Sequence, residues 1–89
     1  MTKKDITNKF ISLVNTHGKN NRLYVFNAIA GEPTLASSTI DCIDVVGDKV
    51  RFMYNINEFD YDWLEAFKVR DLAKFYKDIK DSLDTVGEI

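Results

Sequence analysis

The sequence is poor in the residues that build metal sites and disulfides. Among its 89 residues there is one histidine, His17, and one cysteine, Cys42. One residue of each type cannot supply the ligands of the usual zinc sites, and a single cysteine cannot form an internal disulfide. We therefore expect neither a zinc ion nor a covalent cross-link to stabilise the fold.

Glycine, proline and long apolar runs are also scarce, which excludes further classes. The four glycines form neither a GxGxxG nor a GxxxxGK phosphate loop, so we expect no cofactor. The start, Met1 to Asp5, leads into no signal-peptide core, and no window approaches 18 uninterrupted apolar residues. These features and the lone Cys42 predict a cytoplasmic protein that does not enter a membrane.

What is present suits one small folded domain. Apolar residues make up 45% of the chain and charged residues 29%, which is typical of a globular domain and not of a disordered tail. The chain is too short for two packed cores. We therefore predict a single domain over residues 1–89, with its core over about 2–83.

The first segment is predicted to be a helix. Apolar residues and His17 recur at spacings of three and four: Ile6, Phe10, Leu13, Val14 and His17. Thr2 is a suitable N-cap, with Asp5 three residues later as in a capping box. Gly18 suits the left-handed position after the helix, and Asn20-Asn21 continue the turn.

Three strands are predicted to follow. Residues 22–29 read as a strand with two apolar faces, and Gly47-Asp48 suits a two-residue type II′ hairpin turn. Paired positions in this hairpin then sum to 95. One face pairs Val45 with Val50, Ile43 with Phe52, Asp41 with Tyr54 and Thr39 with Ile56; the other pairs Val46 with Lys49, Asp44 with Arg51, Cys42 with Met53 and Ile40 with Asn55.

The last third lacks glycine and proline between residues 58 and 86 and is predicted to be helical. Asp60 or Asp62 can cap the start, with Glu65 at capping-box spacing from Asp62. A short helix precedes a longer one, with a bend over residues 67–70. The predicted fold class is α+β: a helix, a three-stranded antiparallel meander and a C-terminal helix, either single or split, in two layers. The expected core is Ile6, Phe10, Leu13, Leu23, Val25, Ile43, Val45, Val50, Phe52, Leu72, Tyr76 and Ile79.

The net charge of −2 conceals an uneven distribution. Residues 1–22 carry five basic and one acidic side chain, whereas residues 23–67 carry two basic and eight acidic ones. Four of the acidic residues fall within eight positions: Glu58, Asp60, Asp62 and Glu65. They either complement a helix N-terminus or imitate the phosphates of a nucleic acid.

The sequence indicates no catalytic site. A Cys–His pair needs hydrogen-bond contact, but His17 falls at a helix end and Cys42 in mid-strand. A calcium loop needs a glycine at its sharp turn, and the Asp60–Glu65 stretch has none. We therefore expect no enzyme and no metal site.

The second face of the sheet is the stronger candidate for a contact surface. If both helices cover one face, the other exposes Tyr24, Phe26, Cys42 and Met53. The alternative is a three-layered core with a helix on each face. Aromatic rings beside Lys49 and Arg51 could also stack single-stranded bases, but the surrounding acidic residues oppose direct nucleic-acid binding.

The element order resembles that of the double-stranded-RNA-binding domain over most of the chain. That family carries a lysine cluster at the start of its second helix, where this sequence has the acidic stretch from Asp60 to Glu65. It also carries a histidine beside a Gly-Pro pair, where this loop reads Gly31-Glu32-Pro33-Thr34. The resemblance therefore implies the fold order but not the RNA-binding activity.

Two functions follow as hypotheses. The leading one is a small non-catalytic protein–protein interaction module that binds a protein partner, or a second copy of itself, through the open sheet face. The alternative is an acidic decoy that blocks a nucleic-acid-handling enzyme, as short phage-type inhibitors do. Its contacts would be Glu58, Asp60, Asp62 and Glu65.

Overall fold

The computed structural model describes residues 1–25, 34–35, 38–54 and 61–87. Its elements are α1 (Lys3–His17), β1 (Arg22–Tyr24), β2 (Thr34–Leu35), β3 (Ser38–Val46), β4 (Lys49–Tyr54), β5 (Tyr61–Trp63), the 3₁₀ turn η1 (Leu64–Ala66) and α2 (Val69–Gly87). The predicted α+β class, with a helix at each end of an antiparallel sheet, is confirmed. No described helix is long and apolar enough to cross a membrane.

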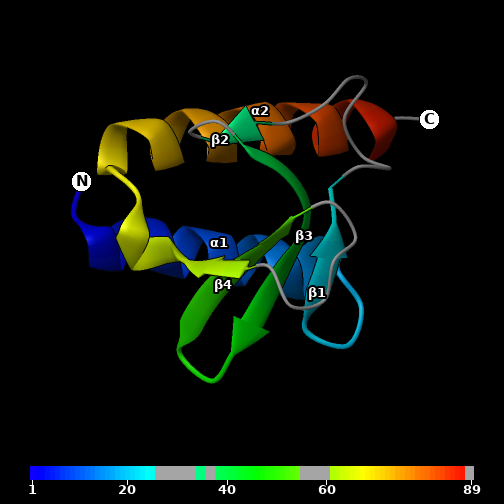
Figure 1. Ribbon diagram of the computed structural model, residues 1–89. Coiled ribbons are helices and arrows are strands. Elements are labelled where there is room, and N and C mark those ends of the chain that lie inside the picture. The colour runs from blue at the N-terminus through cyan, green and yellow to red at the C-terminus, as the bar shows by residue number, and fades with distance from the viewer. Residues whose placement is uncertain (26–33, 36–37, 55–60, 88–89) are drawn as a thin grey trace.

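The two helices pack beside each other on one face of the sheet (Figure 1). The ring of Phe52 in β4 shows this, because it lies 5.5 Å from the ring of Phe10 in α1 and 5.7 Å from that of Phe75 in α2. Within the described part of the chain, the helices therefore form one layer and the sheet another. The three-layered alternative does not hold for these elements.

The core lies between these two layers and contains every predicted core residue. Val45 and Tyr76 are only partly buried, and the others are fully or almost fully buried. Further buried positions are Val14, Ile40, Tyr54, Leu64 and Phe75. Burial of this apolar surface is the main force that holds the helix layer on the sheet.

Helix α1 begins as predicted but ends differently. The Thr2 hydroxyl accepts a hydrogen bond from the backbone N–H of Asp5, whose carboxylate accepts one from the Thr2 N–H. Gly18, however, is extended, with φ −90°. Glycine is needed there for space, because a Cβ would lie 2.3 Å from the Arg22 carbonyl oxygen.

The left-handed residues are instead the two asparagines of the turn that leads into β1. Asn20 has φ 55° and Asn21 has φ 63°. Lys19 and Arg22 exchange two backbone hydrogen bonds, of 2.8 and 3.1 Å, across them. Positive φ at both central residues is the signature of a type I′ turn, which asparagine tolerates well.

The β3–β4 hairpin follows the predicted register as far as Cys42. The pairs Val46–Lys49, Val45–Val50, Asp44–Arg51, Ile43–Phe52 and Cys42–Met53 are all present. Gly47 has φ 64°, as the first central residue of a type II′ turn requires.

Beyond Cys42 the predicted hairpin register is wrong, because a bulge at Asp41 shifts it by one residue. Ile40, and not Asp41, pairs with Tyr54. The extra residue places Ile40 in the core. One Asp41 carboxylate oxygen is enclosed without a hydrogen-bond partner among the described residues. The predicted partners Asn55 and Ile56 lie outside the described residues.

The sheet is also wider than the predicted meander. Its strand order is β1-β3-β4-β5, all antiparallel, and β2 pairs with the start of β3. β5 occupies residues for which a helix start was predicted, so Asp62 lies in a strand and does not cap a helix. The predicted split helix is confirmed: the short helix is the 3₁₀ turn η1, and the chain is extended at Phe67 before the longer helix α2 begins at Val69. Of the predicted strand 22–29, the part after Val25 lies outside the described residues.

Candidate functional site: the outer face of the sheet

Two rows of side chains cross the sheet on the face opposite the helices. The strand registers place Tyr24, Cys42, Met53 and Tyr61 in one row, and Arg22, Asp44, Arg51 and Trp63 in the next. Because side chains alternate between the two faces of a strand, both rows point away from the core residues Ile43 and Phe52. We call the surface formed by these eight residues, with Val46 and Lys49, the outer face.

An ion-pair cluster lies in the middle of the second row. Asp44 is 4% exposed and lies between two arginines from the neighbouring strands. Its Oδ1 accepts a hydrogen bond from Arg22 Nε at 3.2 Å, and its Oδ2 accepts one from Arg51 Nε at 2.7 Å. The Arg22 and Arg51 side chains are 44% and 26% exposed. The cluster therefore joins β1, β3 and β4 on the outer face.

Aromatic rings and cations form the β5 side of the outer face. The rings of Tyr61 and Trp63 meet edge to face, with centroids 6.0 Å apart. The Arg51 guanidinium lies 5.1 Å from the Tyr61 centroid, and Lys49 Nζ lies 5.8 Å from the Trp63 centroid. Such cation–π contacts hold both cations close to the ring faces.

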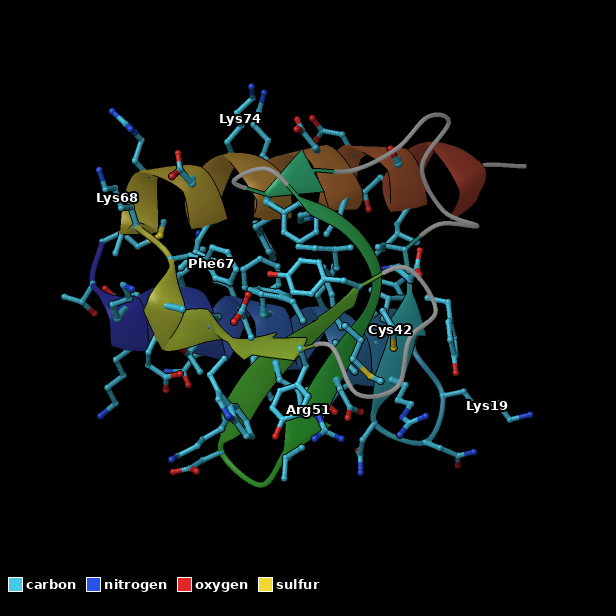
Figure 2. The ribbon with its side chains drawn as sticks, viewed as in Figure 1. Lys19, Cys42, Arg51, Phe67, Lys68 and Lys74 are labelled. Atoms are coloured by element: carbon cyan, nitrogen blue, oxygen red, sulfur yellow. The ribbon has the colours of Figure 1, made fainter. Side chains whose placement is uncertain are left out.

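Large apolar side chains on this face are accessible to solvent. Tyr24 is 56% exposed, while Val46 and Tyr61 are each 44% exposed. Met53 and Trp63 are half-buried. Neither α1 nor α2 packs on this face, and Figure 2 shows Arg51 on the opposite side of the molecule from Lys74 of α2. The described elements thus leave a mixed aromatic and cationic surface open.

Cys42 lies in the first row but is only 3% exposed, so it packs against its neighbours and offers little surface for contact with a partner. Burial, with a smaller effect of the nearby Asp44 carboxylate, raises the pKa of its thiol to about 11. The thiol is therefore protonated at neutral pH. His17 ends α1, which packs on the face of the sheet opposite the row that contains Cys42.

Only two residues of the predicted acidic cluster can be placed, because Glu58 and Asp60 lie outside the described residues, as does Phe26. Asp62 and Glu65 are both exposed. Asp62 lies opposite Phe52 in the β4–β5 register and so points away from the outer face. Burial raises the pKa of Tyr54 above its usual value, and a hydrogen bond to Asp62 raises it further by a smaller amount. Asp62 therefore has a partner in the sheet.

Sequence reasoning missed three residues of the outer face, namely Arg22, Tyr61 and Trp63. The alternation of Tyr61 and Trp63 around Asp62 was the available signal, but the capping-box spacing favoured a helix. Within the described residues, no three His, Cys, Asp or Glu side chains gather into a metal-binding group.

No family model matches the chain, and neither a curated protein nor a solved structure shows similarity to it.

Proposed function

We propose that this protein is a small non-catalytic interaction module that presents its outer face to a partner protein. The observation that supports this proposal is the exposure of Tyr24, Val46 and Tyr61 on a sheet face that neither α1 nor α2 covers. Exposed aromatic side chains with arginines among them are typical of the residues that dominate binding energy at protein interfaces. The proposal also places the module in the cytoplasm.

The ion pairs and cation–π contacts within the outer face support the same proposal. The ion-pair cluster fixes Arg22 and Arg51 against Asp44, and cation–π contacts position Lys49 and the Arg51 head group. Side chains that are already ordered lose less conformational entropy when a partner binds. A partner would therefore meet a surface with most of its geometry in place.

The test compares the proteins that co-purify with the wild-type chain and with matched variants. Tyr24→Ser and Tyr61→Ser each remove an exposed ring from the outer face, whereas Lys74→Ser changes an exposed residue of α2. Urea unfolding first establishes that each variant folds. We expect the same partner with wild type and Lys74→Ser, and a loss of at least about tenfold with either tyrosine variant. A partner retained equally by all four proteins contradicts the proposal.

The acidic-decoy alternative is supported by the exposure of Asp62 and Glu65, and by the position of Asp62 in a strand and not at a helix start. It is tested in the same experiment with the double variant Asp62→Asn and Glu65→Gln. If this variant loses the partner while the tyrosine variants keep it, the decoy replaces the interaction module. A decoy would also bind less tightly as salt concentration rises.

A further inference from the structure

We infer that the partner of the outer face is an acidic segment of another protein, an inference that rests on the proposed function. At the regularly paired positions of the described strands, the outer face carries three cations, Arg22, Lys49 and Arg51, and one carboxylate, that of Asp44. This local excess of positive charge is opposite in sign to the chain's net charge of −2. At physiological ionic strength the screening length is about 8 Å, so a bound partner responds mainly to the local charges.

Arg22 is the residue best placed to hold a carboxylate of the partner. Two guanidinium groups share the single carboxylate of Asp44, so among the described residues one positive charge in the cluster has no counter-charge. Arg22 is the more exposed of the two, at 44%, and binds Asp44 through Nε. A hydrogen bond with Tyr24 is the main cause that raises the pKa of Arg22, and the charge of Asp44 is the second. Both contacts help to fix the position of the guanidinium. A planar guanidinium fixed in this way can bind a second carboxylate.

The neighbouring rings make an acidic protein segment a better fit than a nucleic acid. Arg51 lies over one face of the Tyr61 ring, and Lys49 lies over one face of the Trp63 ring. The two rings are nearly perpendicular to each other, at 88°. Stacking of successive bases needs ring faces that are free and arranged as a platform. Apolar side chains of a peptide can instead pack against ring edges, Val46 and Met53, while its carboxylates meet the cations.

A second copy of the chain fits the outer face poorly. A twofold axis through an interface brings the same surface of both subunits together. It would place two cationic faces opposite each other, and like charges across an interface oppose association. We therefore assign the face to a heterologous partner.

The experiment is a selection of random peptides displayed on phage against the immobilised full chain. The best peptide is then synthesised and titrated, with Trp63, the single tryptophan, as fluorescent reporter on the outer face. We expect selected peptides rich in Asp and Glu, with affinity that decreases as salt rises from about 0.05 to about 0.3 M. Arg22→Gln and Lys49→Gln should each weaken binding by about tenfold, and the matched control Lys74→Gln should leave it unchanged.

Each other outcome overturns a defined part of the inference. Neutral or basic peptides whose binding requires Tyr24 would overturn the acidic partner but keep the proposed function. Peptides unaffected by Tyr24→Ser would overturn the proposed function itself. Tighter binding of a short oligothymidylate than of the best peptide would assign the face to nucleic acid. A mass above 10.2 kDa in light scattering that returns to 10.2 kDa in Tyr24→Ser would assign it to a second copy.

Discussion

At the scale of single residues, the Asp44 carboxylate links three strands of the sheet, β1, β3 and β4. It is almost fully buried and provides the counter-charge for an arginine on each neighbouring strand. The hairpin register predicted its pairing with Arg51, because the turn at Gly47-Asp48 fixes which residues lie opposite each other. Its pairing with Arg22 could not be predicted, because β1 reaches β3 through a long connection that sets no register.

The substitution Asp44→Asn should destabilise the fold by about 1–3 kcal/mol, since it leaves two arginines without their counter-charge while both remain partly exposed to water. The measurement is the free energy of unfolding in urea. Arg22→Gln is the matched comparison, and it should cost less than about 1 kcal/mol because its side chain is 44% exposed and Asp44 keeps Arg51. Equal losses from the two substitutions would show that the cluster does not act through Asp44.

At the scale of elements, local signals predicted α1 and the β3–β4 hairpin but not the bulge or β5. The capping box of α1 and the Gly-X turn each depend on neighbours in sequence. The bulge at Asp41 depends on long-range packing that places Ile40 in the core, and no local pattern shows it. β5 has three residues, which is too short for alternation to outweigh the helix signals of Asp62 and Glu65.

Gly18, which follows α1, and Gly47, which follows β3, should respond differently to substitution by alanine. At Gly47, φ is 64° and a Cβ would meet nothing within 4 Å, so Gly47→Ala should cost about 1–2 kcal/mol of backbone strain. At Gly18, a Cβ would lie 2.3 Å from the Arg22 carbonyl oxygen and 2.6 Å from that of Val14. Gly18→Ala must displace backbone between α1 and β1 and should cost more than about 2 kcal/mol. Thermal unfolding of both variants checks the order, and a larger loss at Gly47 would reverse it.

At the scale of the whole molecule, alkaline pH should limit stability. Burial raises the pKa of Cys42 from 9.0 to about 11 and raises that of Tyr54 as well. The unfolded chain therefore loses these protons at lower pH than the folded one. The contribution of Cys42 to the free energy of unfolding is complete below about pH 9 and decreases between about pH 9 and pH 11.

The measurement is the free energy of unfolding as a function of pH. Its slope above pH 9 should be negative, with at most about 1.4 kcal/mol per pH unit from each group. For Cys42→Ala, the free energy of unfolding should decrease less steeply with pH between pH 9 and 11 than it does for the wild type. The comparison is between slopes and not between absolute stabilities. An identical slope in both proteins would show that the thiol is not responsible.

The packing of the first helix against the last has a consequence for how the chain folds during synthesis. α1 buries Phe10 against Phe75 of α2, and Lys3 Nζ donates hydrogen bonds to the carbonyl oxygens of Glu65 and Phe67. These contacts join positions more than 60 residues apart in the chain. On the ribosome, α1 therefore emerges long before its partner. Its apolar face therefore stays without its native contacts until α2 leaves the exit tunnel, and in that interval transient contacts or a chaperone must cover it.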